Sequence, residues 1–160
     1  MSTSRPWYRV KRWMYAGNRP NGLARWMNAV SEWQFRHGIL TFSGHGVTLE
    51  VRGRVSGRPV RIPLVLVRRG GQRYVVSMLG TSAQWLRNLR ADNGRAVLYA
   101  PHPEPVTLVE VPVTSRAPIL QQYLQLAPGA RPHIPVDRHA PLDRFAAIAP
   151  DYPVLRVQQA

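Results

Sequence analysis

The residues best suited to binding chemistry lie in a short basic turn, Arg-Val-Ser-Gly-Arg-Pro, at residues 54–59. Gly57 can take a positive φ at little steric cost, which closes a hairpin between two apolar segments. Ser56 adds a hydroxyl, and we expect neighbouring backbone N–H groups to face outward as an anion-binding concavity. Planar guanidinium groups that can bind phosphate or carboxylate oxygens in pairs come from Arg54, Arg58 and Arg61. The turn therefore predicts an anion site, with a solvated basic hairpin as the alternative.

The charge of the chain is strongly positive and unevenly placed. The 160 residues carry 22 Lys or Arg against 8 Asp or Glu, a net charge of +14. All of the excess lies in residues 1–100, which hold 17 basic and 3 acidic residues, whereas residues 101–160 hold 5 of each. Such a charge attracts a polyanionic cofactor, a nucleic acid or an anionic membrane.

Several kinds of active site find no support in the sequence. Without cysteine, disulfides, iron–sulfur clusters and thiol catalysis are excluded, and a cytoplasmic location is favoured. The five histidines are scattered without metal-ligand spacing, so we expect no metal site. Ser56 lacks the G-x-S-x-G context of a hydrolase, and no pair of carboxylates is poised for acid–base work. We therefore assign no catalytic side chain and expect a cofactor to carry the chemistry.

The pattern along the chain predicts a small β-barrel with flanking helices. Apolar alternation and turn residues indicate six strands, at 47–54, 59–67, 73–78, 95–99, 106–113 and 153–157. Helical spacing indicates helices at about 22–36, at 82–92 with Thr81 or Ser82 as the cap, after Ser115 as the cap, and at 141–149. Residues 127–141 are rich in proline and are expected to be irregular. Tight turns between the early strands disfavour a parallel, doubly wound sheet.

Three motifs in order resemble the deazaflavin-dependent nitroreductase and quinone reductase family. They are G-R-x-S-G-x-x-x-x-x-P-L at 53–64, R-Y-x-x-x-S-x-x-G at 73–80 and W-x-x-N-L-R-A at 85–91. The closing segment 152–157 resembles the last strand of that family. The resemblance implies a mainly β, α+β fold of the split β-barrel, flavin-reductase-like type. It also implies coenzyme F420, an 8-hydroxy-5-deazaflavin with a phosphate and a glutamate tail.

The resemblance assigns three groups of cofactor-binding residues. The anionic tail and phosphate would be held by Arg54, Ser56, Gly57, Arg58 and Arg61. The ring would lie on Ile62, Pro63, Leu64, Ser77, Met78, Leu79 and Gly80. The helix at the cofactor would contribute Trp85, Asn88 and Leu89. The alternative role is strand core for the ring-binding residues and an aromatic of the protein core for Trp85. This chain has Val55 where the family often has lysine, which removes one cation from the turn.

The function expected from these observations is hydride transfer between reduced F420 and an organic acceptor such as a quinone or a nitro compound. The alternatives are a non-catalytic flavin, deazaflavin or haem-binding protein on the same barrel, with FMN or haem in place of F420, and, with less support, a nucleic-acid-binding barrel. No nucleic-acid partner is expected, because the motifs gather in one hairpin and helix and no aromatic RNA-binding motif is present.

The N-terminal segment suggests a further contact. Residues 1–20 form a basic aromatic arm containing Trp7, Tyr8, Trp13 and Tyr15, ahead of a single domain at 21–160. Arginines interleaved with amphipathic aromatics suit the headgroup region of an anionic membrane. Peripheral attachment at the inner face of the membrane and a homodimer are therefore further hypotheses. We also expect Arg54→Ala and Arg58→Ala to weaken cofactor binding with little effect on stability, because exposed charges seldom hold a fold together.

Overall fold

The computed structural model describes residues 45–160. The predicted arm at 1–20 and the predicted helix at 22–36 lie outside the described residues. The boundary between arm and domain at residue 20 therefore stays a prediction.

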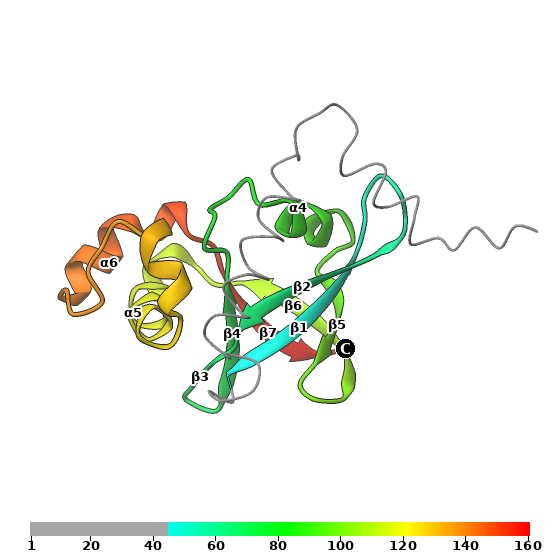
Figure 1. The fold of residues 1–160 in the computed structure, drawn as a ribbon, viewed down its shortest axis with the longest axis horizontal. Coiled ribbons are helices and arrows are strands. Elements are labelled where there is room, and N and C mark those ends of the chain that lie inside the picture. Colours follow the sequence, from blue (N-terminus) through cyan, green and yellow to red (C-terminus); the bar gives the residue numbers. More distant parts are fainter. Residues whose placement is uncertain (1–44) are drawn as a thin grey trace, which may run out of the picture. The chain divides into compact units, whose positions relative to one another are not determined.

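Seven antiparallel strands form one sheet (Figure 1). In chain order they are β1 (Gly46–Arg52), β2 (Pro59–Val65), β3 (Val67–Arg69), β4 (Gln72–Val76), β5 (Arg95–Tyr99), β6 (Pro103–Glu110) and β7 (Val154–Gln159). Their order across the sheet is β2-β1-β5-β6-β7-β4-β3. The two edge strands, β2 and β3, are separated in the chain by Leu66 alone. The sheet must therefore curl until its edges meet, which confirms the predicted barrel-like, antiparallel architecture.

The break at Leu66 corrects the single strand expected at 59–67. Leu66 is fully buried, and its N–H donates to the carbonyl of His45 at 2.7 Å. On one side of it β2 pairs with β1, and on the other β3 pairs with β4. The apolar run at 59–67 thus forms two strands that pair with different partners. The periodicity of the sequence alone does not reveal this change of partner.

Alternation along the strands separates an inner from an outer face. Leu49 faces inward and lies opposite Ile62 on β2 and Leu98 on β5, and all three side chains are fully buried. The neighbouring residue, Glu50, lies opposite Arg61 on the outer face. Residues directly opposite each other in an antiparallel pair point to the same face of the sheet. Two adjacent residues of the first motif, Arg61 and Ile62, are therefore on opposite faces.

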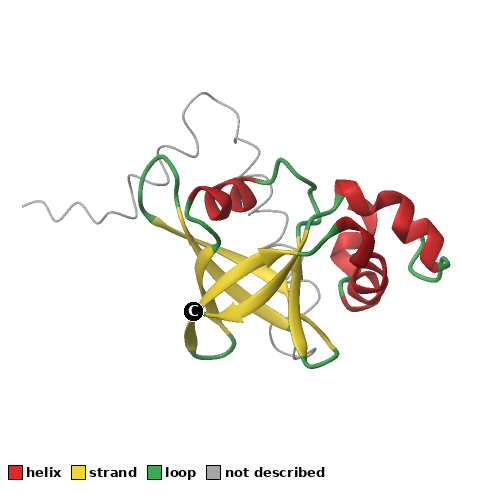
Figure 2. Ribbon diagram, turned by 180° about the vertical axis from the view of Figure 1, so that it is seen from behind, coloured by secondary structure: helices red, strands yellow, loops and turns green. Residues whose placement is uncertain are grey.

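Helix α4 (Gln84–Ala91) lies across one end of the sheet, next to β1 (Figures 1 and 2). Its buried residues are Trp85, Leu86, Asn88 and Leu89, a spacing that places them on one side of the helix. Burial of Trp85 and Leu89 stabilises this docking by about 2 kcal/mol for each side chain. The N-cap is Ala83 with no side-chain cap bond, so the predicted caps Thr81 and Ser82 are wrong. Packing on the barrel, rather than a cap, holds this short helix.

A second helical group covers the β3–β4 side of the sheet (Figure 2). It contains α5 (Ala117–Leu126), α6 (Leu142–Ile148) and three short 3₁₀ segments, at Val113–Ser115, Pro128–His133 and Ala149–Asp151. The predicted cap Ser115 instead ends the first 3₁₀ segment, and Arg116 occupies the N-cap of α5. The proline-rich stretch 127–141, predicted to be irregular, contains one of these 3₁₀ turns.

The β5–β6 hairpin also differs from the expected one. Strand β6 begins at Pro103, opposite Tyr99, so the strand expected at 106–113 starts earlier and ends at Glu110. Pro103 lies at the first position of the strand, where a missing N–H does least harm to the ladder.

Candidate cofactor site

The turn between β1 and β2 is closed by its own backbone. The N–H of Gly53 donates to the carbonyl of Arg58 at 2.8 Å, and the N–H of Gly57 donates to the carbonyl of Gly53 at 2.8 Å. Gly57 has φ +69°, and a Cβ on Gly53 would lie 2.6 Å from Oγ of Ser56. The two glycines of the first motif are therefore required by the shape of the turn.

Other bonds within the turn bear on the expected anion-binding concavity. The Ser56 hydroxyl accepts a bond from the N–H of Arg58 at 3.2 Å, and the N–H of Arg54 donates to Oδ1 of Asn88 at 3.2 Å. Together with those of Gly53 and Gly57, four N–H groups of the turn are thus bonded inside the protein, whereas those of Val55 and Ser56 have no bond to residues 45–160. An anion here would meet those two N–H groups together with the guanidinium groups of the turn.

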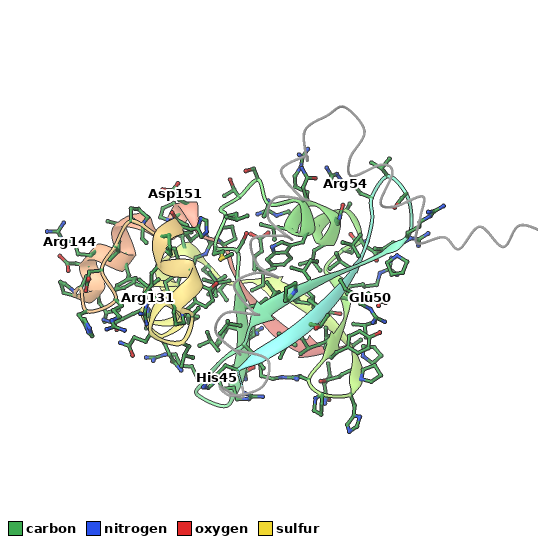
Figure 3. The ribbon with its side chains drawn as sticks, in the orientation of Figure 1. His45, Glu50, Arg54, Arg131, Arg144 and Asp151 are labelled. Carbon is green, nitrogen blue, oxygen red and sulfur yellow. The ribbon has the colours of Figure 1, made fainter. Side chains whose placement is uncertain are left out.

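Arg54 connects the turn to α4 (Figure 3). Its two terminal nitrogens donate to Oδ1 of Asn88 at 2.7 Å and to Oε1 of Gln84 at 2.8 Å. Asn88 is only 5% exposed. The structure therefore brings together Arg54 and Asn88, two residues predicted from different motifs. Sequence reasoning missed Gln84, although it stands four residues before Asn88 on the same side of the helix.

Three arginines at this turn retain an uncompensated charge. Within residues 45–160, none of Arg52, Arg54 and Arg58 forms an ion pair. A Cβ at Gly57 would lie 3.8 Å from a terminal nitrogen of Arg52, so that guanidinium lies against the turn. Close positive charges raise the local potential and attract a polyanion. Arg52 was not among the predicted site residues.

Arg61, predicted to join this clamp, has a different environment. Its Nε donates to Oε2 of Glu50 at 2.8 Å, and its guanidinium lies 4.8 Å from the centre of the Tyr99 ring. The Tyr99 hydroxyl in turn donates to the same Glu50 oxygen at 3.2 Å. Because a carboxylate already balances the charge of Arg61, this arginine adds less to an anion site than those at the turn.

The residues predicted to bind the ring divide by burial. Ile62, Ser77, Trp85 and Leu89 are buried to 2% exposure or less, which places them in the core. The Ser77 hydroxyl donates to the carbonyl of Gly80 at 2.7 Å and locks the turn after β4. Side chains with accessible surface belong to Pro63, Leu64, Met78 and Leu79. Among the residues predicted to bind the ring, only these four therefore have side chains that a ring could contact.

Among residues 45–160 there is no cluster of three or more histidine or acidic residues that could hold a metal ion. No helix in that same region has the length and apolar character needed to cross a membrane.

Solved structures with a similar chain path share little sequence with this protein. An F420-H2 dependent reductase aligns with 17% identity over 71% of this chain and 94% of its own, with a TM-score of 0.49. A protein of unknown function from Agrobacterium tumefaciens aligns with 13% identity over 73% of this chain and 50% of its own, with a TM-score of 0.50. An FMN-binding, pyridoxamine 5′-phosphate oxidase-related protein from Nostoc punctiforme aligns with 17% identity over 86% of this chain and 82% of its own, at 0.47.

Family comparison gives the functional assignment. No curated protein matches the chain by sequence. The family model described as F420H(2)-dependent quinone reductase matches residues 28–142, which cover most of the chain and all three predicted motifs. The cofactor expected from the motifs, coenzyme F420, is the one that this family uses. By this match the chain belongs to the F420H(2)-dependent quinone reductase family and is an F420-dependent oxidoreductase.

Proposed function

We propose that this protein transfers a hydride from reduced F420 to a quinone, with the anionic tail of the cofactor held at the β1–β2 turn. The observation that carries the proposal is the arginine group Arg52, Arg54 and Arg58, which has no carboxylate partner among the described residues. Bound F420 supplies the two-electron chemistry through its deazaflavin ring. A nitro compound is the second acceptor to test.

The donors at the turn fit the tail of F420. Its phosphate and glutamate oxygens are planar or tetrahedral oxyanions, and guanidinium groups bind such oxygens with charge-assisted hydrogen bonds. Arg54 is fixed by α4, whereas the Arg58 guanidinium has no hydrogen-bond partner among residues 45–160. We assign Arg54 to a contact of fixed orientation and Arg58 to a contact through a guanidinium that no other described side chain holds. We leave Arg61 outside the clamp because Glu50 neutralises it.

The ring surface that we propose uses the accessible apolar residues. Pro63 stands on the outer face of β2, and Met78 and Leu79 follow the end of β4. Strands β2 and β4 approach each other, so these residues come from neighbouring parts of the curled sheet. An apolar surface of this kind excludes water from one face of a planar ring and fixes its orientation.

A titration of the purified full chain with oxidised F420, FMN and haem tests the cofactor assignment. Fluorescence or absorbance should show saturable binding of F420 and much weaker binding of FMN and haem. Reduced F420 should then be oxidised on addition of a soluble naphthoquinone. Tight binding of FMN or haem without F420 binding would instead favour the non-catalytic flavin or haem protein.

We further propose that residues 1–18 attach the protein to an anionic membrane, where a lipid-soluble quinone would be found. The proposal is supported by the aromatic and basic composition of that segment, which lies outside the described residues. Sedimentation with anionic vesicles should show salt-sensitive binding of the full chain and weaker binding after deletion of residues 1–18. Equal binding of both proteins at low and high salt would exclude the arm as the contact. The proposed homodimer is tested by light scattering of the same two samples.

A further inference from the structure

The partners of Arg54 differ in kind from those of the ion-paired arginines. Arg61, Arg73 and Arg90 each donate to a glutamate carboxylate. Arg54 donates instead to two side-chain amide oxygens, those of Asn88 and Gln84. A carboxylate cancels the charge of a guanidinium, whereas a neutral amide oxygen accepts the hydrogen bond and leaves the charge in place. Arg54 is therefore held in position without being neutralised.

The two amide contacts also fix the plane of the guanidinium. They come from different terminal nitrogens, at 2.7 Å and 2.8 Å, so rotation about the end of the side chain would break at least one of them. A guanidinium has five N–H groups. With two of them used, three remain for a ligand, and Arg54 is exposed to solvent. These three donors have a set direction before any ligand arrives.

The buried amide anchors the arrangement to the barrel. Asn88 is 5% exposed, and its Oδ1 accepts from both the backbone N–H and one terminal nitrogen of Arg54. The same atom thus fixes where the turn stands and where its guanidinium points. Because both lone pairs of Oδ1 are engaged by Arg54, this oxygen is not available to a cofactor.

We propose that Asn88 and Gln84 are positioning residues that hold Arg54 as a preoriented fork for an oxyanion, the phosphate or a carboxylate of the cofactor tail. This inference rests on the proposed function for the identity of the ligand. It reassigns Asn88 from a direct cofactor contact to a residue that acts through Arg54. Preorganisation of this kind strengthens binding by lowering the entropy lost when a long side chain is immobilised.

A double-mutant cycle separates the two roles. Oxidised F420 is titrated by fluorescence into the wild type, Gln84→Ala, Asn88→Ala, Arg54→Ala and the two double variants. We expect each amide variant to weaken binding about 3- to 10-fold in the presence of Arg54, and less than about twofold in the Arg54→Ala background. Equal loss in both backgrounds would overturn the proposal, because it would mean direct contact with the cofactor. Gln84→Ala removes only an exposed bond and keeps the test valid if Asn88→Ala unfolds.

Lysine substitution provides a readout that a merely structural role would not change. Lysine supplies a charge but no planar fork. Arg54→Lys should therefore lose most of the affinity lost by Arg54→Ala, whereas Arg58→Lys, at the unanchored arginine of the same turn, should retain most of the wild-type affinity. Wild-type affinity in Arg54→Lys would contradict the proposal.

Inorganic pyrophosphate, followed by the shift in melting temperature, gives a second probe that does not depend on F420. If pyrophosphate stabilises the wild type and this effect requires both Arg54 and Gln84 while F420 fails to bind, the proposed function is wrong and the oriented fork stands. If F420 binds and Arg54→Ala has no effect on either ligand, the fork is wrong and the cofactor is held elsewhere. Stabilisation by pyrophosphate that is unchanged in Gln84→Ala would also reject the fork.

Discussion

Arginines gather both at the β1–β2 turn and at the end of β6, but only those at the end of β6 are paired with a carboxylate. At the end of β6, Glu110 accepts a hydrogen bond from Arg90 at 2.6 Å and lies 3.9 Å from Arg116. Arg116 is 6% exposed and donates to the carbonyls of Val111 and Ala149. At the turn, Arg54 meets only amide oxygens. The arginines near β6 are thus bonded to carboxylate and carbonyl oxygens and connect elements of the fold. The arginines at the β1–β2 turn keep a positive charge that a ligand can neutralise.

The electrostatics of the β6 cluster agree with this division. The hydrogen bond from Arg90, assisted by the nearby charge of Arg116, lowers the pKa of Glu110. Burial lowers the pKa of Arg116 from its usual high value, and the attraction of Glu110 opposes that effect. The cluster joins α4, β6, the N-cap of α5 and the 3₁₀ segment Ala149–Asp151. Its loss should therefore affect folding, whereas loss of charge at the turn should mainly affect binding.

Arg116→Met should have the largest effect on stability. It leaves the carbonyls of Val111 and Ala149 without their donor, which we expect to lower the free energy of unfolding by about 2–4 kcal/mol. Urea unfolding at neutral pH measures the change, and F420 affinity should be unaltered while the protein is folded. Arg144→Met, at an exposed arginine of α6, is the matched control. A change below about 0.5 kcal/mol would show that the cluster is not structural.

Arg54→Ala should weaken F420 binding by about 1.5–3 kcal/mol, the value of charge-assisted hydrogen bonds. The structure revises the expectation that its stability stays unchanged, because Gln84 loses its donor and Asn88 keeps only the backbone N–H of residue 54. We expect an additional loss of about 1 kcal/mol in unfolding free energy. Arg58→Ala should weaken binding without that second loss. Identical unfolding curves for Arg54→Ala and the wild type would mean that the bonds from Arg54 to α4 do not contribute to stability, and that Arg54 does not differ from Arg58 in this respect.

Lowering the pH should remove the contribution of Glu110 in the β6 cluster to the stability of the fold. Because the pKa of Glu110 is lowered in the folded protein, its ionised form stabilises the fold. This contribution is complete above the ordinary glutamate pKa of about 4.3 and is lost as the pH falls through the lowered value. Glu110→Gln should reduce the acid-induced loss of stability by no more than about 1 kcal/mol, since the side chain is 37% exposed. Urea unfolding at several acid pH values measures it, with Asp143→Asn as the control. An unchanged acid dependence would place the stabilising charge elsewhere.

Salt should produce the smallest effect and should act mainly on the turn. Raising monovalent salt from about 0.05 M to about 0.5 M should weaken F420 binding a few-fold, because exposed charges are screened. The melting temperature should change little over the same range. Arg58→Ala should show a shallower dependence of affinity on salt than the wild type. Equal slopes would mean that Arg58 does not face the anionic tail.

The sequence alone determined the strand pairs joined by short turns and the family. Alternation placed β1, β4 and β5 within a few residues of their observed bounds, because one face of each strand is buried. The glycines at 53 and 57 and the motif W-x-x-N marked the turn and the helix that the structure joins through Arg54. These features are local, so local residue spacing was enough to find them.

Only the tertiary structure decided which arginines are neutralised. Arg54 and Arg61 are both near the turn in sequence, yet one meets amides of α4 and the other meets Glu50 across the β1–β2 ladder. The division of 59–67 at Leu66 likewise depends on two strands, β1 and β4, that lie on opposite sides of it in the chain. Ionic partners and strand partners are distant in sequence, and residue types at single positions do not specify them. The charge available to a ligand is therefore a property of the fold.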